Sequence, residues 1–196
     1  MLLRKTGAVD YLIAGLGNPG LSYEGTRHNA GCSALGVLAK DCRVELTKRQ
    51  FHALTATVNL GDKKVLLLYP QTFMNNSGQA VQEAMAFYKL TPDKLLVMSD
   101  DISLDVGVVR IRKKGSDGGQ KGLRSIIEHI GSEEFARVRI GVGAKPHPAY
   151  DLAEWVLSKF KKDELPLMED AFVHAAEAAK MIAAGNIEEA TNRYSH

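Results

Sequence analysis

The sequence contains few of the features that mark exported or membrane proteins. Only two of its 196 residues are cysteines, Cys32 and Cys42, so it cannot form a disulfide framework, and we expect both thiols to be reduced. No apolar run approaches the ~20 residues that a helix needs to cross a bilayer. Residues 1–8 include two basic side chains but no apolar stretch with a cleavage site, which predicts a short mobile extension. We therefore predict a cytoplasmic protein with one domain over residues 9–196.

The chain also has little excess of either charge. The formal net charge is only +2, so the overall charge predicts no nucleic-acid partner. The distribution of charged residues along the chain is more informative. Between residues 110 and 124, six basic residues stand against one acidic residue, Asp117, around a glycine-rich loop. A local basic face suits a polyanion, although a solvated loop without a partner explains the charges equally well. The six basic residues are Arg110, Arg112, Lys113, Lys114, Lys121 and Arg124.

Short apolar strand patterns alternate with helical patterns along the whole chain. The run at residues 11–14 predicts a buried strand, and residues 53–60 and 64–69, separated by Gly61-Asp62, predict a hairpin. There is no internal repeat and no linker. The alternation predicts a single α/β domain with a central mixed, twisted sheet flanked by helices on both faces. Further strands are expected at 94–99, 107–113 and 137–142, and helices at 29–40, 77–89 with Ser77 as its cap, 123–130, 149–157, 163–184 and after Gly185.

A glycine-rich segment directly after the first predicted strand matches the G-x-G-x-x-G pattern of dinucleotide-binding sites. It reads Gly15-Leu16-Gly17-Asn18-Pro19-Gly20. In such sites a helix begins at the glycines and its N-terminus binds the pyrophosphate. Here residues 19–25 have no helical periodicity, and the predicted hairpin replaces the second strand–helix unit. We therefore predict no nucleotide cofactor, and infer that the glycines let the chain turn sharply and direct Asn18 into a cleft.

Three polar segments follow predicted strands, and a doubly wound sheet would gather them at the carboxyl ends of its strands. The second segment spans residues 70–78. The first contains Asn18, Tyr23, Arg27, His28 and Asn29, and the third is an acidic loop, Ser99-Asp100-Asp101.

His28 is the candidate general base, because imidazole titrates near neutral pH and can accept a proton from water. The alternative is that His28 only caps the helix that begins near Asn29. Asp100 favours catalysis if it contacts the imidazole, since a carboxylate fixes the tautomer and stabilises the imidazolium. Otherwise Asp100 and Asp101 form a solvated turn or a metal pair. No further carboxylates or histidines stand at ligand spacing, and we predict no metal site.

Amides and aromatic rings in the same segments could hold a substrate. Asn18 and Asn75 each offer one acceptor and two donors, which can orient an ester or bind an oxyanion, although asparagine is also common in turns. Tyr23 and Phe73 could stack on an exposed base, a contact worth about 1–3 kcal/mol per base, although Phe73 could equally belong to the core. No cysteine or serine lies in a setting typical of a nucleophile.

These residues belong to a series of longer motifs that covers nearly the whole chain. The motifs are residues 12–20 with Tyr23, residues 26–31, Thr72-Phe73-Met74-Asn75 with Ser77-Gly78, Asp100-Asp101 with Leu104, Gly107 and Arg110, Gly115-Ser116 with Gly118-Gly119, residues 137–143, and Ala190-Thr191-Asn192. In content and order they closely resemble the motifs of bacterial peptidyl-tRNA hydrolases. Because the motifs are long, chance agreement is a poor explanation.

The resemblance implies a monomeric, metal-independent hydrolase without an obligate protein partner, which cleaves the ester between a peptide and the 3′-terminal adenosine of tRNA. It also implies that His28 is the base, that Asp100 supports it, and that Asn18 recognises the first peptide unit. Tyr23, Phe73 and Asn75 would hold the 3′ end. The basic residues between 110 and 124 would take the acceptor-stem phosphates, which gives a salt-dependent affinity.

One segment departs from the family pattern. Members usually have Gly-Gly-His-Asn-Gly after the glycine-rich loop, whereas this chain has Gly119-Gln120-Lys121-Gly122. Lysine donates hydrogen bonds but accepts none, so Lys121 cannot reproduce both sides of an asparagine amide. We expect Lys121 to bind tRNA and activity to persist. The alternatives are a non-catalytic RNA-binding relative of the same fold, as among plant organellar splicing factors, and a nucleotide-dependent enzyme that uses the glycine loop.

Overall fold

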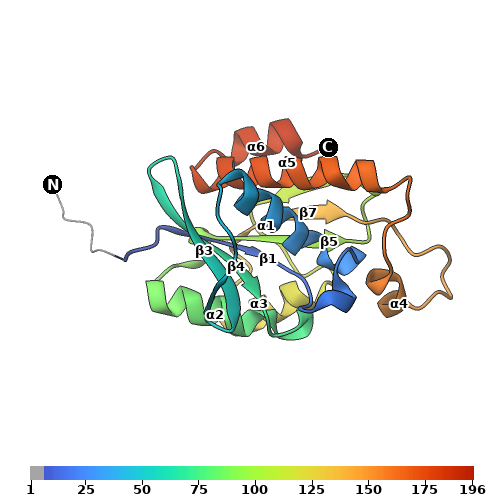
Figure 1. Cartoon of the computed structure of the whole chain (residues 1–196), viewed down its shortest axis with the longest axis horizontal. Helices are drawn as coiled ribbons and strands as arrows, with labels where there is room; N and C mark the ends of the chain where they lie inside the picture. The colour runs from blue at the N-terminus through green and yellow to red at the C-terminus, as the bar shows by residue number, and fades with distance from the viewer. Residues whose placement is uncertain (1–6) are drawn as a thin grey trace.

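A seven-stranded mixed sheet forms the centre of the structure, a computed structural model in which residues 7–196 are described (Figure 1). The strands are Tyr11–Gly15 (β1), Lys48–Gln50 (β2), Ala53–Leu60 (β3), Lys63–Pro70 (β4), Leu95–Asp101 (β5), Val109–Arg112 (β6) and Ala136–Gly141 (β7). Their order is β2-β3-β4-β1-β5-β7-β6. β1 runs parallel to β4 and β5, and β5 runs parallel to β7, whereas the other pairs are antiparallel. The carboxyl ends of β1, β4 and β5 therefore meet at one edge of the sheet.

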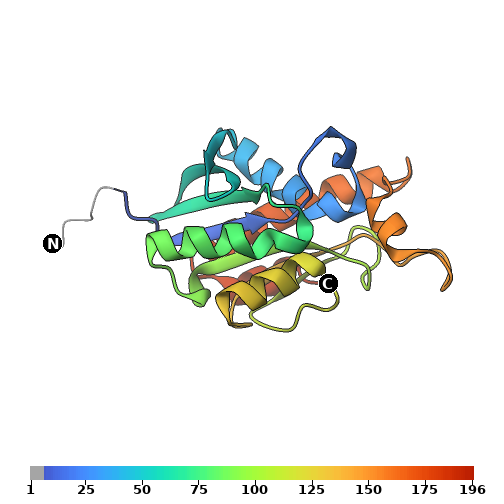
Figure 2. The same cartoon turned by 90° about the horizontal axis from the view of Figure 1, so that it is seen from below.

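Helices cover both faces of the sheet. They are Ala30–Asp41 (α1), Ser77–Tyr88 (α2), Lys121–Ile130 (α3), Leu152–Leu157 (α4), Leu165–Ala183 (α5) and Ile187–Tyr194 (α6). Figure 1 shows α1, α5 and α6 on one face and α2 and α3 on the other, with α4 beyond the end of the sheet. Seen from below, α2 and α3 lie side by side (Figure 2). Gly78 permits this close approach, since a Cβ there would lie 2.1 Å from the main-chain oxygen of Ser125.

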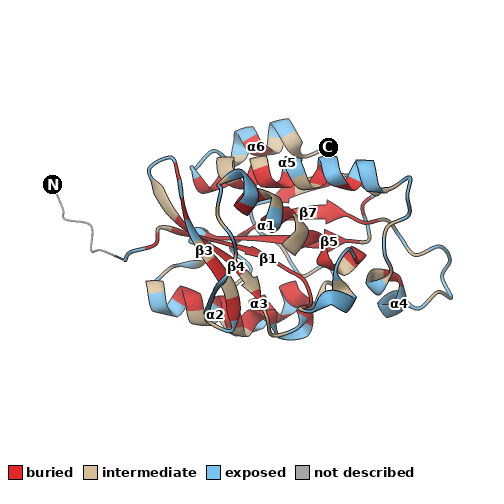
Figure 3. Cartoon of the chain, in the orientation of Figure 1, coloured by how far each residue is buried: buried red, intermediate tan, exposed pale blue. Residues whose placement is uncertain are grey.

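Alternate residues of the central strands fill the two halves of the core. In β1, Tyr11 and Ile13 pack with α1 and α5, whereas Leu12 and Ala14 pack with α2 and α3. Every residue of β1 is buried, as Figure 3 shows for the middle of the sheet. A strand covered on both faces has no polar side, which explains why its sequence is a continuous apolar run rather than an alternating one.

The predicted fold class is confirmed: this is an α/β domain with a mixed sheet between two helical layers. The predicted hairpin and all six predicted helices are present, with ends shifted by up to three residues. No helix within residues 7–196 is both long and apolar enough to cross a bilayer. The boundary at residue 9 stays a prediction, because most of the proposed mobile extension lies outside the described residues.

The prediction of an acidic loop at residues 99–101 is wrong. Ser99, Asp100 and Asp101 end β5, and all three are buried. Charged groups can end a buried strand when each carboxylate has a donor. Asp101 accepts hydrogen bonds from Ser103 and contacts the guanidinium of Arg139. The predicted cap at Ser77 is also wrong, because its hydroxyl donates to the main-chain oxygen of Met74 and the helix starts from a preceding 3₁₀ turn.

The glycine-rich segment serves close packing more than turning. Within it only Gly20 has a positive φ, 107°. A Cβ at Gly15 would lie 2.6 Å from the Leu35 Cβ, and one at Gly17 would lie 2.5 Å from the Cys32 Sγ. Both glycines thus let the loop after β1 lie directly on α1. The next segments are single 3₁₀ turns at residues 21–23 and 27–29, in place of the helix that a dinucleotide site requires.

Candidate active site

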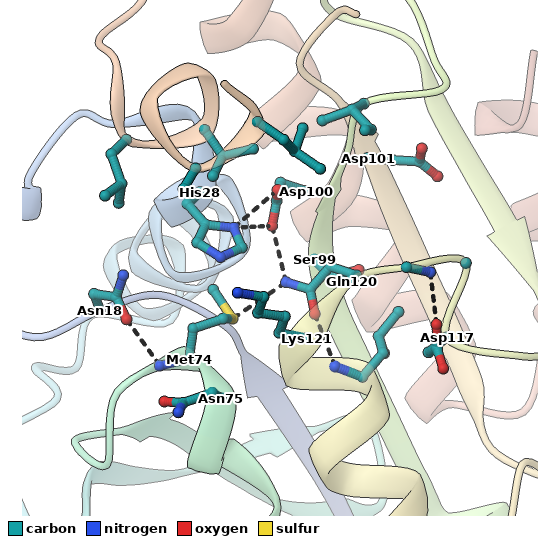
Figure 4. A pocket seen from close by; sticks show the side chains of 18 of the residues that line it. Asn18, His28, Met74, Asn75, Ser99, Asp100, Asp101, Asp117, Gln120 and Lys121 are labelled. Carbon is teal, nitrogen blue, oxygen red and sulfur yellow. Dashed lines mark hydrogen bonds and ion pairs between the residues drawn. The ribbon is translucent and has the colours of Figure 1, made fainter. Parts of the chain in front are cut away.

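A pocket of about 420 Å³ opens at the carboxyl ends of β1 and β5. Its walls come from the loop after β1, the turn before α2, the end of β5, the start of α3, and α4 (Figure 4). Six of the seven residues that the sequence proposes as catalytic or substrate-binding line it: Asn18, His28, Phe73, Asn75, Asp100 and Lys121. Segments more than 100 residues apart therefore converge on one cavity.

His28 and Asp100 form the one direct imidazole–carboxylate contact that lines this pocket. Nδ1 of His28 lies 3.0 Å from both carboxylate oxygens of Asp100. A carboxylate only accepts, so the neutral ring carries its proton on Nδ1 and keeps a lone pair on Nε2. Figure 4 shows Nε2 pointing into the pocket. The side chain of His28 is 13% exposed and that of Asp100 is 3% exposed, so the pair is shielded while Nε2 stays accessible.

His28 stands in a short 3₁₀ turn, Arg27–Asn29, that is anchored on both sides. The side chain of Asn29 exchanges two hydrogen bonds with the main chain of Asn18, at 2.8 and 2.9 Å. Asn29 precedes α1 without capping it, and His28 makes no cap either. The interpretation of His28 as only a helix cap is therefore wrong. The turn holds the imidazole over the pocket.

Asn18 is held by its side-chain oxygen. That oxygen accepts from the main-chain N–H of Met74 at 2.8 Å, and the residue is 8% exposed. Its amide nitrogen makes no hydrogen bond to another residue within 7–196, so two N–H donors remain for a ligand. Asn75, one residue after Met74, is exposed at the rim. The structure thus presents amide donors on the side of the pocket opposite Asp100 (Figure 4).

Two aromatic rings flank the entrance. Phe73 is 51% exposed, so the interpretation of Phe73 as core is wrong. Its backbone has a φ of 61°, which a bulky residue rarely adopts, and its ring lies edge-on to Tyr23 with centroids 6.2 Å apart. Tyr23 is half-buried and lies outside the pocket lining. The strained backbone turns Phe73 outward, where its face is free to stack.

The predicted basic surface runs along β6 and into α3, beside the pocket. Of its six members only Lys121 lines the cavity, and its side chain points inward without a hydrogen bond or ion pair to any residue within 7–196 (Figure 4). Three others face acids in exposed pairs, which are worth about 0–1 kcal/mol and can yield to a phosphate. These pairs are Lys113–Glu188, Lys114–Glu134 and Arg124–Asp117, while Arg110 and Arg112 lie on β6.

Sequence reasoning missed the apolar wall of the pocket. α4 contributes Leu152, Ala153, Val156 and Leu157, of which the two leucines are more than 40% exposed. Their spacing, with pairs four residues apart, is the signal that could have found this face. Large exposed apolar side chains beside a polar pocket suit a ligand with an apolar part.

A buried arginine ties α4 to the turn that carries His28. Arg27 is 1% exposed and its guanidinium donates to Ser158, to the carbonyl of Val142 and, at 2.7 Å, to Glu164. The same group lies 3.9 Å from the ring centroid of Trp155. A charge this deep is tolerated because it is paired and hydrogen-bonded. Sequence reasoning missed this role, although it grouped Arg27 with the first polar segment.

Cys32 lies beneath the pocket, and burial raises the pKa of its thiol to about 12. Burial also raises the pKa of Cys42, but by less. Thiolate is the reactive form, so at pH 8 we expect native Cys32 to be alkylated more slowly than Cys42. Mass spectrometry after timed labelling measures both rates. Unfolding in guanidinium should make the two rates similar. Equal rates in the native protein would contradict the burial of Cys32.

Comparison with known proteins agrees with this geometry. A model of the family described as peptidyl-tRNA hydrolase matches residues 12–196. The chain belongs to the peptidyl-tRNA hydrolase family. It is 48% identical to the peptidyl-tRNA hydrolase of Caldicellulosiruptor saccharolyticus, covering 94% of this chain and 96% of that protein, and 46% identical to that of Lachnospira eligens, covering 94% and 99%. A crystal structure of peptidyl-tRNA hydrolase from Acinetobacter baumannii superposes with a TM-score of 0.88 at 37% identity, over 94% of this chain and 95% of that one.

Membership of the peptidyl-tRNA hydrolase family confirms the resemblance found in the sequence and identifies the chain as a hydrolase. The match covers the pocket and all the elements that form it. No three His, Cys, Asp or Glu side chains within residues 7–196 are grouped so that they could hold a metal ion. The polar side chains that line the pocket carry imidazole, carboxylate, amide, guanidinium and ammonium groups.

Proposed function

We propose that this chain hydrolyses the ester between the peptide and the 3′-terminal adenosine of peptidyl-tRNA, with His28 as general base. The observation that carries the proposal is the His28–Asp100 contact at 3.0 Å, which occupies Nδ1 and leaves Nε2 of the ring directed into the pocket. An imidazole in this state accepts a proton from water near neutral pH. Water is the proposed nucleophile, since the pocket lining holds no cysteine and Ser99, its one serine, is buried.

The proposed reaction has two steps. Water attacks the ester carbonyl, a C–O bond forms, and the departing proton goes to Nε2 of His28 while Asp100 stabilises the imidazolium. The tetrahedral intermediate then collapses, the bond to the ribose O3′ breaks, and the imidazolium returns its proton to that oxygen. The products are a peptide acid and tRNA. Amide N–H groups of Asn18 and Asn75 are the proposed donors to the carbonyl oxygen and the first peptide unit.

The proposed substrate contacts extend outward from the ester. Phe73 and Tyr23 flank the entrance and are proposed to hold the terminal adenosine. Phe73 would stack on the base, and Tyr23 would contact the edge of the base. The apolar face of α4 is proposed to accept peptide side chains. Acceptor-stem phosphates are assigned to Arg110, Arg112, Lys113, Lys114 and Arg124. With such a substrate, a product of translation, we propose that the chain acts in the cytoplasm, and that it acts as a monomer, as the resemblance to the family implies.

A turnover assay tests the proposal. Release of tRNA from an N-blocked aminoacyl-tRNA is measured beside the same tRNA with a free amino group, and we expect the blocked substrate to be cleaved preferentially. Preference for the free amino acid would contradict the role of Asn18. Absence of turnover together with tight tRNA binding would instead support the non-catalytic RNA-binding alternative, which the Lys121 departure favours.

Replacement of Lys121 by alanine tests the proposed contact with tRNA. We expect kcat/KM to fall roughly tenfold, because a hydrogen bond to a charged group is worth about 1.5–3 kcal/mol. The slope of log kcat/KM against log salt concentration should decrease by about 1, the effect of one lost phosphate contact. Lys63→Ala is the matched control, because Lys63 begins β4 at the end of the strand that lies away from the pocket. It should change neither kcat/KM nor the salt slope. An unchanged rate and slope in Lys121→Ala would exclude this role.

A further inference from the structure

Gln120 joins three parts of the site through its side-chain amide. Oε1 accepts from the main-chain N–H of Leu123 at 2.8 Å and so caps α3. Nε2 donates to Oδ1 of Asp100 at 3.0 Å, and lies 3.1 Å from the Sδ of Met74. Figure 4 shows the amide between the carboxylate and the first turn of α3. The residue therefore bridges the end of β5 and the start of a helix on the other side of the pocket.

The orientation of this amide follows from its partners. The main-chain nitrogen of Leu123 is a donor, so the amide atom facing it must be the oxygen. The nitrogen then necessarily faces Asp100, whose carboxylate can only accept. The absence of a side chain at Gly122 lets the first turn of α3 lie this close to the site, since a Cβ there would lie 2.6 Å from the Sδ of Met74 and 3.0 Å from Oε1 of Gln120. The donor to Asp100 is thus fixed by the backbone of α3.

The carboxylate of Asp100 consequently has two kinds of donor. His28 approaches both of its oxygens, and Gln120 approaches one of them. A buried carboxylate held by a single ring nitrogen can rotate about its terminal torsion, whereas a second donor at an angle to the first defines one plane. Gln120 does not titrate, so it supplies this donor at every pH at which the protein is folded.

We propose that Gln120 is a positioning residue for the hydrolytic site, which orients the Asp100 carboxylate and shares its negative charge, and thereby sets how strongly Asp100 holds a proton on His28. This proposal rests on the proposed function. It assigns a role to one of the two residues at which the chain departs from the family motif. Glutamine there combines a helix cap and a carboxylate donor in one neutral group.

Other charged groups line the same pocket and are kept constant in the test. Lys121 and Asp117 reach the pocket from the segment around Gln120, and Asp101 and Arg139 from β5 and β7. Cys32 of α1 is the remaining titratable neighbour, and burial keeps it protonated. A variant that changes Gln120 alone therefore reports on its own bond to Asp100.

The decisive variant is Gln120→Ser, because serine at an N-cap can still accept from Leu123 but cannot reach Asp100. With less of its charge shared, Asp100 should stabilise the imidazolium more strongly. We expect the acid limb of the kcat/KM profile to move upward by roughly half a pH unit, and kcat to fall roughly tenfold through poorer orientation. Gln120→Glu keeps the cap but adds a second carboxylate, and should move the limb by roughly one unit or more.

A spectroscopic readout separates this proposal from the proposed function. The NMR titration of the His28 ring signals in the free protein should show the same upward movement of its midpoint, with or without turnover. Thermal unfolding should be nearly unchanged in Gln120→Ser. A serine variant with wild-type kcat, acid limb and ring titration would overturn the proposal and leave Gln120 as a helix cap only. If the wild type lacks turnover but the ring titration moves as expected, the proposed function fails and the link between Gln120 and Asp100 stands.

Discussion

Replacement of His28 by alanine is expected to lower kcat/KM for an N-blocked aminoacyl-tRNA by roughly 10²- to 10⁴-fold, the usual contribution of a positioned general base. The loss should appear mainly in kcat, because Nε2 acts on water in the transition state and not on the bound ester. Without the imidazole, the attacking water must lose its proton to solvent. The amide donors remain, so some activity above the uncatalysed rate should persist.

Initial rates of tRNA release measure this effect, and His174→Ala is the matched control. His174 lies on the exposed outer face of α5, against the ring of Tyr194 and away from the pocket. We expect its variant to keep wild-type kinetics. Binding of deacylated tRNA should be retained in both variants, which shows that the pocket still forms. A His28→Ala enzyme with wild-type kcat would remove His28 from the mechanism.

Replacement of Asp100 by asparagine is expected to lower kcat by roughly 10²- to 10³-fold through the wrong histidine tautomer. The Nε2–H of Gln120 requires an acceptor, so it selects the amide oxygen for the position of Oδ1. The amide NH₂ then occupies the position of Oδ2, 3.0 Å from Nδ1 of His28. Nδ1 is equally 3.0 Å from the position of Oδ1, where the amide oxygen can still accept from it. In the fraction of molecules in which Nδ1 instead accepts from the amide NH₂, Nε2 carries the proton and cannot take one from water.

A variant of the neighbouring carboxylate completes the test. Asp101→Asn changes the adjacent carboxylate, which contacts Arg139 and Ser103 but not His28. We expect it to lose much less activity than Asp100→Asn. Comparable losses in the two variants would mean that the acidic end of β5 acts as a whole, and would argue against a specific tautomer effect at position 100.

Most of the fold could be predicted because its central strands are apolar on both sides and its helices are periodic. β2 could not, since Lys48–Gln50 has no apolar pattern and exists only by pairing with the edge of β3. For a similar reason the local sequence predicts a loop at the acidic end of β5, where the structure has a strand. Local sequence cannot show that a histidine 72 residues away and a glutamine 20 residues away supply the donors that let Asp100 be buried.

The polar half of the site was also predictable, because Asn18 and His28 follow β1, Asp100 lies at the end of β5, and the carboxyl ends of these two strands meet. The apolar half was not. α4 is held beside the pocket partly by Arg27, which donates to Ser158 at the end of α4 and to Glu164 just before α5, contacts that span more than 130 residues. The direction of Lys121 was equally inaccessible from sequence, since it depends on where α3 begins. Long-range contacts thus decided the parts that sequence reasoning missed.

The anchoring of Arg27 also bears on when the protein becomes competent during its own synthesis. The turn that carries His28 leaves the ribosome early, but it is held by hydrogen bonds to the main chain of Ser158 and to the side chain of Glu164. Until the chain has emerged beyond that glutamate, the guanidinium has no counter-charge and cannot be buried. We therefore expect a chain that ends before Glu164 to lack the anchored turn that carries His28, and to stay inactive until that part of the chain has been made.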